Sequence, residues 1–177
     1  MLDVTELRFG LDTFGDVTHD DNGRPNPAAR VIRDVVEQGV LADQVGVDAI
    51  GLGEHHRDDF SISTPDVVLA AIAARTRRIL LGSAVTVLSS DDPIRVFQRF
   101  STLDALSSGR AELTVGRGSF VESFPLFGYR LDDYDVTASG DFLTCDSISS
   151  GGNSHGTLAA GGAAGNPSGG PLGLGRK

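Results

Sequence analysis

Cysteine, lysine and long apolar runs are all scarce in this chain of 177 residues, which has one cysteine, Cys145, and one lysine, Lys177. A single cysteine excludes an intrachain disulfide and a cysteine-built metal site. The 15 basic and 24 acidic residues give a formal net charge of -9. This balance argues against nucleic acid, because phosphate binding needs clustered positive charge. No apolar run approaches the roughly 18 residues of a membrane span, so we expect a partner that is neither nucleic acid nor membrane.

The first ten residues also lack the basic start and apolar stretch of a secretory signal. We therefore expect a cytoplasmic protein. Hydrophobic residues make up 40% and charged residues 22% of the chain, a composition typical of soluble globular proteins. The length suits one ordinary domain.

Glycine divides the chain into two parts. Twelve of the 23 glycines lie in residues 1–136 and eleven in residues 137–177, where only four residues are charged. The second part is rich in Gly and Ser and has too few large apolar side chains to offset the entropy of ordering it. We expect a folded domain over residues 1–136. Residues 137–177 are interpreted as a disordered or out-of-frame tail.

The folded part alternates strands and helices. Four segments have the apolar composition of β-strands: residues 7–11, 48–53, 79–88 and 111–115. The third segment is apolar almost throughout, as in strands buried on both faces of a parallel sheet. The pattern predicts an α/β fold of right-handed βαβ units. It fits both an open doubly wound sheet and a closed eight-stranded barrel.

Each gap between these segments carries a helix-start signal, in which a capping residue precedes proline. The signals are Asn26–Pro27, Thr64–Pro65 and Asp92–Pro93. Gly46 and Gly109 suit the left-handed ends of the first and third helices. The turn after the first strand is a long polar loop without the G-x-G-x-x-G pattern of dinucleotide-binding folds, which weakens a nucleotide-binding interpretation.

Polar residues follow three of the four predicted strands. Glu54–Arg57 (EHHR) comes after the second strand, Ser89–Asp92 after the third and Gly116–Ser119 (GRGS) after the fourth. Chemistry in parallel α/β folds collects at these strand ends. Histidine can take a proton near neutral pH. An arginine between glycines can approach a phosphate.

The same residues also have simpler interpretations. Glu54, His55 and His56 could form an ordinary polar loop, and Arg117 alone could be a surface charge. Asp91–Asp92 is most simply a helix cap. The two histidines are sequence neighbours and no third residue has metal-site spacing, so no metal site is predicted.

Several blocks of the sequence resemble, in order and spacing, the bacterial luciferase-like family of flavin-dependent monooxygenases. They are LRFGLDTF (7–14), the run from DAIGLGEHHRDDF (48–60) to ALSSGRAELTVGRGS (105–119), and FPLFGYRLDDYD (124–135). The resemblance implies a (β/α)8 TIM barrel that binds reduced FMN or, in some branches, the deazaflavin F420. It also implies oxidation of a small organic substrate by O2. The EHHR and GSAVTVL blocks look more like the FMN-dependent branch, and the substrate stays open.

The resemblance also assigns site residues. His55 matches the catalytic histidine of the family, and Ala84–Val85 matches a non-prolyl cis peptide that lies against the flavin ring. Arg117 matches a ligand of the flavin phosphate, and Glu54 is assigned to the same cofactor site. Gly116 stands where true luciferases have a reactive cysteine, so light emission is not implied.

A complete barrel of this kind needs about 250 residues, and the pattern stops after Asp135. We therefore expect a partial TIM barrel of four strands and three helices, left by a truncated or frame-disrupted gene. Its inward face is expected to include Leu11, Ile50, Leu52, Val85 and Val115.

Three functional interpretations follow from this truncation. The chain is an active flavin-dependent oxidoreductase, a non-catalytic remnant, or a flavin-binding partner subunit of a complete homologue. A half barrel exposes unpaired strand edges, which two copies would cover if they paired as a homodimer.

Overall fold

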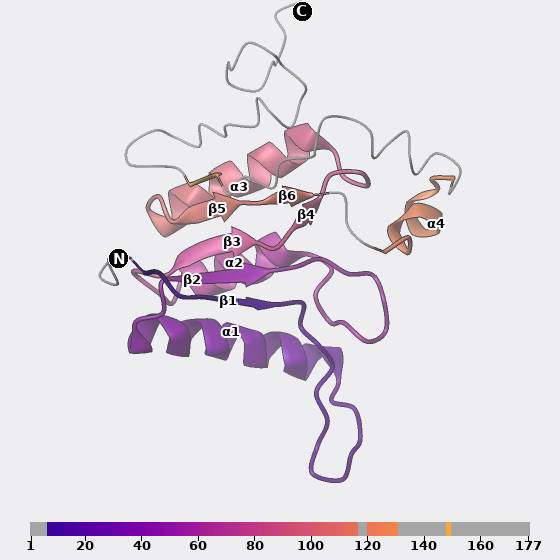
Figure 1. The fold of residues 1–177 in the computed structure, drawn as a ribbon, viewed down its shortest axis with the longest axis horizontal. Helices are drawn as coiled ribbons and strands as arrows, with labels where there is room; N and C mark the ends of the chain where they lie inside the picture. The colour runs from indigo at the N-terminus through magenta and orange to yellow at the C-terminus, as the bar shows by residue number, and fades with distance from the viewer. Residues whose placement is uncertain (1–6, 117–119, 131–147, 150–177) are drawn as a thin grey trace, which may run out of the picture.

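The computed structural model describes residues 7–116, 120–130 and 148–149. Figure 1 shows a sheet with helices along it. The elements, in chain order, are β1 (Gly10–Thr13), α1 (Ala28–Val45), β2 (Ala49–Leu52), α2 (Pro65–Ala73), β3 (Leu80–Ser83), β4 (Thr86–Val87), α3 (Pro93–Ser107), β5 (Ala111–Leu113), β6 (Val115–Gly116), α4 (Ser123–Phe127) and β7 (Ile148–Ser149).

The main sheet has the order β1-β2-β3-β5-β7, and its first four strands are parallel. β7 joins it antiparallel to β5, while β4 and β6 form a second, parallel pair. Four parallel strands alternating with three long helices confirm the predicted α/β architecture of a partial barrel. Apart from β7, the predicted tail over residues 137–177 lies outside the described residues, so its disorder stays a prediction.

Two of the predicted strands are interrupted. The segment predicted over 79–88 forms β3 and β4, which are separated by a cis peptide bond between Ala84 and Val85. The segment predicted over 111–115 forms β5 and β6, which are separated at Thr114. The interruptions lie side by side, because the side chain of Ser83 bonds the backbone of Thr114.

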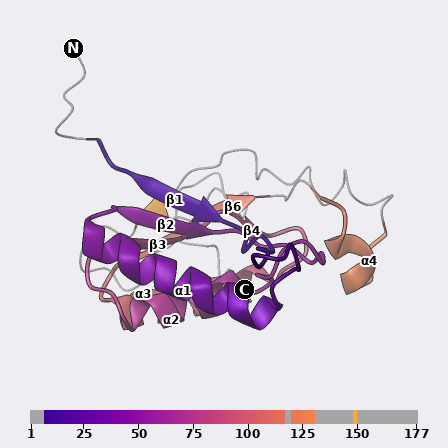
Figure 2. The ribbon, with the colours of Figure 1, turned by 90° about the horizontal axis from the view of Figure 1, so that it is seen from below.

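The helices α1, α2 and α3 lie on one side of the sheet (Figure 2). The buried core fills the space between the two layers and includes Ile50, Leu52, Leu69, Ile72, Leu81 and Phe100. The prediction that Ile50 and Leu52 face inward is therefore wrong. Side chains alternate along a strand, and the register that pairs Ile50 with Leu81 turns both toward the helices.

The opposite face of the sheet has small residues at its centre, between Asp12 of β1 and Glu112 of β5. Gly51 of β2 pairs with Gly82 of β3, so two neighbouring strands lack a side chain at the same level. A methyl group at Gly82 would lie 3.7 Å from Glu112 Cβ, an ordinary contact. At Gly51 it would lie 3.0 Å from Ala84 Cβ and 2.1 Å from Asp12 Oδ1. We call Gly51, Gly82 and Ala84 the glycine strip.

Two of the three helix starts differ in detail from the predictions. Asp92 caps α3 as expected, and its carboxylate accepts from the backbone N–H groups of Ile94 and Arg95. Thr64 precedes α2, but its side chain makes no capping bond. The cap of α1 is Pro27 and not Asn26, because the Asn26 side chain is bonded to the hydroxyl of Thr18.

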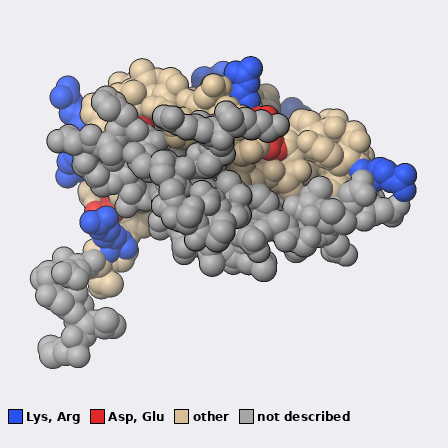
Figure 3. Space-filling model, turned by 90° about the horizontal axis from the view of Figure 1, so that it is seen from above, with Lys and Arg blue, Asp and Glu red and all other residues tan. Residues whose placement is uncertain are grey.

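Charge and hydropathy add two observations. In the view of Figure 3 the described arginine side chains form separate groups at the margins of the molecule rather than one patch. Among the described residues, no helix is long and apolar enough to cross a membrane.

Candidate active site

The loops after β1 and β2 bind one another at the carboxyl end of the sheet. The backbone N–H of Val17 donates to the carbonyl of Asp59 (3.0 Å), and that of Ser61 donates to the carbonyl of Gly15 (2.7 Å). Within the second loop, the N–H of His55 donates to the carbonyl of Ile62 (3.0 Å). These bonds fix the backbone of His55 directly beyond the end of β2.

Aromatic rings enclose the imidazole of His55. Phe60 stacks on it at 4.4 Å between ring centroids and 23° between planes. Phe14, from the loop after β1, lies 4.9 Å away, and Phe120 meets the imidazole edge-on at 5.0 Å. Gly53 permits this arrangement, because a methyl group there would lie 2.1 Å from the Phe14 ring.

Glu122, which precedes α4, binds the same imidazole. Its Oε1 lies 2.9 Å from His55 Nδ1, and the two side chains are only 19% and 10% exposed. Burial opposes ionisation of Glu122, but hydrogen bonds from His55 and from the backbone of His56 outweigh it and lower the pKa of this carboxyl. The pair therefore joins a carboxylate to an imidazole where solvent screens them little.

The neighbouring histidine has a different partner. His56 Nε2 lies 2.8 Å from Glu54 Oε1, with the two side chains 12% and 11% exposed. The ring of Phe127 in α4 meets the His56 ring edge-on at 5.1 Å. The segment around α4 thus contacts both histidines, through Glu122 and Phe127.

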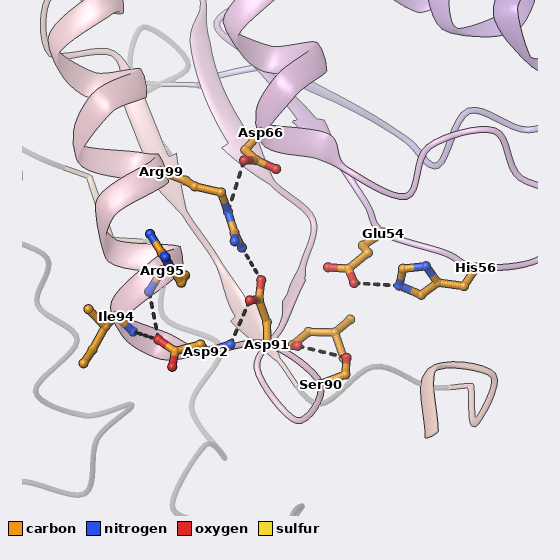
Figure 4. A network of polar contacts seen from close by, with 10 residues as sticks. Glu54, His56, Asp66, Ser90, Asp91, Asp92, Ile94, Arg95 and Arg99 are labelled. Atoms are coloured by element: carbon orange, nitrogen blue, oxygen red, sulfur yellow. Dashed lines mark hydrogen bonds and ion pairs between the residues drawn. The ribbon is translucent and has the colours of Figure 1, made fainter. Parts of the chain in front are cut away.

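The Glu54–His56 pair lines a polar cavity of about 160 Å³ at the starts of α2 and α3. Across the cavity, Arg99 forms ion pairs with Asp66 (3.1 Å) and with Asp91. Figure 4 shows these groups in one view. The hydroxyl of Thr86, which also lines the cavity, is buried and has no hydrogen-bond partner in the described part of the chain.

The cis peptide Ala84–Val85 lies beside the end of β2. The N–H of Ala84 donates to the carbonyl of Leu52 (2.8 Å), three residues before His55. A methyl group at Gly53 would lie 3.0 Å from the carbonyl oxygen of Ala84, and one at Gly116 would lie 2.8 Å from Val85. Glycines on both flanks therefore let the backbone pass close to this peptide.

The residues present fit a flat ring system. The residues of the glycine strip carry no side chain larger than a methyl group, although the carboxylate of Asp12 lies against Gly51, and the cis peptide predicted for Ala84–Val85 is confirmed. The aromatic cluster around His55 lies beyond the adjacent strand end. Arg117, the predicted phosphate ligand, lies outside the described residues. Among the described residues, no group of three or more potential ligands could hold a metal ion.

The structure separates two of the residues that the sequence analysis grouped. Glu54 pairs with His56 and lines the polar cavity, whereas His55 lies among aromatic rings with Glu122. Glu122 and Phe120 were not predicted from the sequence. His55 and Glu122 are 67 positions apart, and no spacing rule connects them. The only signal was the position of Glu122 soon after the predicted phosphate ligand.

Comparison with known proteins gives one family. The model of the luciferase-like monooxygenase family matches residues 12–138. The sequence is 39% identical over 117 residues to y4wF of Sinorhizobium fredii, covering 65% of this chain and 34% of that protein. It is 38% identical over 104 residues to 4-hydroxyprotoasukamycin monooxygenase of Streptomyces nodosus subsp. asukaensis, covering 58% and 28%. The chain spans about a third of the length of these curated relatives.

Solved structures share the fold. Monooxygenase RslO1 from Streptomyces bottropensis matches with a TM-score of 0.65 at 25% identity, covering 75% of this chain and 40% of that one. A second match is the oxygenating constituent of 3,6-diketocamphane monooxygenase of Pseudomonas putida in complex with FMN. Its TM-score is 0.64 at 21% sequence identity, and the match covers 74% of this chain and 36% of that one. A third match is an F420-dependent secondary alcohol dehydrogenase in complex with an F420-acetone adduct. Its TM-score is 0.58 at 20% sequence identity, and the match covers 73% of this chain and 38% of that one.

Proposed function

The chain belongs to the luciferase-like monooxygenase family, and on this premise we propose that the ends of its strands form the flavin side of a monooxygenase site. The proposed reaction is the oxidation of a small organic molecule by O2. A bound reduced flavin would supply the electrons that reduce O2.

The observation that carries the proposal is the position of the glycine strip relative to His55. The strip lies on β2 and β3 and in the Ala84–Val85 peptide, and His55 lies three residues after the last residue of β2. A flat ring on the strip would find a proton-transferring imidazole at its border. The Phe14 and Phe60 rings around that imidazole would exclude water from it.

Each of the proposed site residues has one role. His55 holds or moves a proton at Nε2, and Ala84–Val85 supports the ring from the side of the sheet. Arg117 binds the flavin phosphate with its guanidinium. Glu54 is proposed to contact the cofactor from the adjacent polar cavity, where its carboxylate binds His56.

The proposed cofactor is a flavin, and FMN is favoured over F420. The EHHR (54–57) and GSAVTVL (82–88) blocks support FMN, since they resemble the FMN-dependent branch of the family. A solved neighbour with FMN and one with F420 share the fold, so the fold alone does not choose between them. The proposed substrate class is a small organic molecule.

Anaerobic titration of the purified protein with reduced FMN, oxidised FMN and F420 tests the proposal. We expect reduced FMN to bind with a Kd in the micromolar range and tighter than F420. We also expect oxygen consumption by reduced FMN to change when the protein is added. Absence of binding at several hundred micromolar of either cofactor would leave the chain as a remnant without this function.

A second candidate is a flavin-binding protein that needs a second copy of itself for turnover. Leu7, Phe9 and Leu11, along and before β1, are 57%, 68% and 50% exposed. Among the described strands, β1 pairs only with β2. We propose a second copy of the chain as the partner that covers this edge.

Light scattering on the purified protein tests this second candidate. The pairing predicts twice the mass of one chain, and a Leu11→Lys variant should return the mass to that of a monomer. A monomeric wild-type protein across micromolar concentrations would contradict pairing.

A further inference from the structure

His55 and His56 each bind a different glutamate, and each uses a different ring nitrogen to do so. His55 binds Glu122 through Nδ1 at 2.9 Å, while His56 binds Glu54 through Nε2 at 2.8 Å. Both pairs are mostly buried, so water competes weakly for these bonds. Two adjacent residues of one type therefore have their rings fixed in different ways.

A carboxylate can only accept a hydrogen bond, so each bonded ring nitrogen must carry the proton. The bond to one nitrogen decides which tautomer a neutral imidazole adopts. Glu122 thus selects the Nδ1–H form of His55, and Glu54 selects the Nε2–H form of His56. The unprotonated nitrogen is Nε2 in His55 and Nδ1 in His56.

The surroundings of His55 leave Nε2 as its reactive atom. Phe60 covers a face of the ring, Phe14 and Phe120 lie against it, and Glu122 occupies Nδ1. No hydrogen bond to Nε2 occurs among the described residues. A bound molecule with an acidic proton could therefore transfer that proton to Nε2. The Nδ1–H group, on the other side of the ring, stays bonded to Glu122.

We propose that Glu122 is the positioning residue that holds His55 in the Nδ1–H tautomer, with Nε2 ready to accept a proton from the bound substrate or flavin. The assignment of a proton-transfer role rests on the function proposed above. In that step the proton moves to Nε2 while the Nδ1 proton stays in place. The resulting imidazolium is adjacent to the Glu122 carboxylate, which offsets its charge.

Other charged groups near the pair come from the loop after β2. Arg57 lies over the Phe120 ring at 4.8 Å and is bonded to Asp59 at 2.8 and 2.9 Å. Arg57 interacts electrostatically with Glu122, and Asp59 does so with His55. Because Arg57 and Asp59 neutralise each other, Glu122 is the group that distinguishes the two ring nitrogens.

Long-range ¹H–¹⁵N correlation spectra of the imidazoles test the proposal in the protein without flavin. At pH 8.5, where an ordinary imidazole is neutral, we expect His55 in the Nδ1–H form and His56 in the Nε2–H form. His55→Gln and His56→Gln variants assign the signals against His19 and His155. A His55 signal of the Nε2–H form in the wild-type protein would overturn the proposal, whatever the behaviour of any variant.

Two substitutions at one position separate hydrogen bonding from bulk. Glu122→Gln keeps the bulk and an acceptor oxygen, but its amide can also donate to Nδ1, so it should weaken the preference for the Nδ1–H form. Glu122→Leu removes the acceptor altogether and should lose that preference. Glu54→Leu is the matched control and should alter the signals of His56 but leave the tautomer of His55 unchanged. An unchanged tautomer of His55 in a folded Glu122→Leu variant would contradict the positioning role.

The result is independent of flavin binding. If reduced FMN does not bind but the tautomers follow the two glutamates, the proposed function fails and the positioning by Glu122 stands. If reduced FMN binds but the His55 tautomer ignores Glu122, the positioning fails alone.

Discussion

Ser83 and Thr114 join the two interrupted strands at the level of the cis peptide. The hydroxyl of Ser83 donates to the carbonyl of Thr114 (2.8 Å) and accepts from its backbone N–H (3.1 Å). One side chain thereby takes the place of the ladder bonds that the interruption removes. The next two residues are Ala84 and Val85, so this junction also positions the proposed flavin contact.

Replacing Ser83 by Ala should destabilise the protein by about 1–3 kcal/mol, because the backbone N–H of Thr114 loses its acceptor. The carbonyl of Thr114 loses one of two donors and still accepts from the backbone N–H of Thr86 (2.9 Å). Urea unfolding measures the change. Ser101→Ala is the control, since the Ser101 hydroxyl is buried and has no hydrogen-bond partner among the residues that the structure describes. Its loss should cost less than about 0.5 kcal/mol. Equal effects of the two substitutions would contradict the role of the Ser83 hydroxyl.

Replacing Arg110 should also lower the stability of the protein strongly. Its guanidinium makes five hydrogen bonds of 2.8–3.1 Å at the ends of α2 and α3. The acceptors are Ala73, Thr76, Ile79 and Ser107. Arg110→Met should lower the free energy of unfolding by about 2–4 kcal/mol, because these acceptors lose their donors. The exposed Arg95→Met substitution is the matched control, and a similar loss there would show a general effect of removing arginine.

Asp43 should make stability depend on pH. Burial would raise the pKa of this carboxyl, but the backbone N–H groups of Ile79, Arg78 and Arg77 lower it below its usual value of 3.8. A lowered pKa in the folded state stabilises the protein above the unfolded value, and this stabilisation is lost as the pH falls through the folded value. Asp43→Asn should therefore be less stable than the wild type at pH 6. The difference should shrink when urea unfolding is repeated below pH 3.8, and a constant difference would contradict this account.

Gly53 should be sensitive to the smallest substitution. In Gly53→Ala the new methyl group would occupy the position of the Phe14 ring, at 2.1 Å. We expect a loss of about 1–3 kcal/mol from overpacking. Gly10→Ala, whose methyl group would meet Ala49 at 3.7 Å, should cost nothing measurable in the same thermal unfolding experiment. A stable Gly53→Ala variant with an unchanged Phe14–His55 contact would contradict the packing described for this cluster.

Local signals in the sequence were sufficient for the elements but not for their surroundings. Asp92–Pro93 marked the start of α3 because capping depends on neighbouring residues only. The same signal placed the cap of α1 one residue early, because Asn26 is bonded to Thr18 across a loop. Likewise, apolar composition identified residues 79–88 as strand, but it does not reveal which face of a strand meets the helices.

The candidate site, too, could be predicted only in part from the sequence. His55 was recognisable from its position after a buried strand, and the cis peptide at Ala84–Val85 from resemblance to the family. Glu122 was not recognisable from the sequence, because its pairing with His55 depends on how the residues just before α4 pack against the loop after β2. Contacts between distant segments of this kind depend on the tertiary fold, which spacing in the sequence does not describe.

The most direct test of the account is the affinity of reduced FMN for Gly82→Ala compared with the wild type and Gly10→Ala. The methyl group at Gly82 fits the sheet, with its nearest contact at 3.7 Å, but it stands on the strip where the ring is proposed to lie. Anaerobic titration should show binding weakened about tenfold in Gly82→Ala, or 1.4 kcal/mol, and unchanged in Gly10→Ala. Equal affinity of all three proteins would contradict the placement of the flavin on the glycine strip.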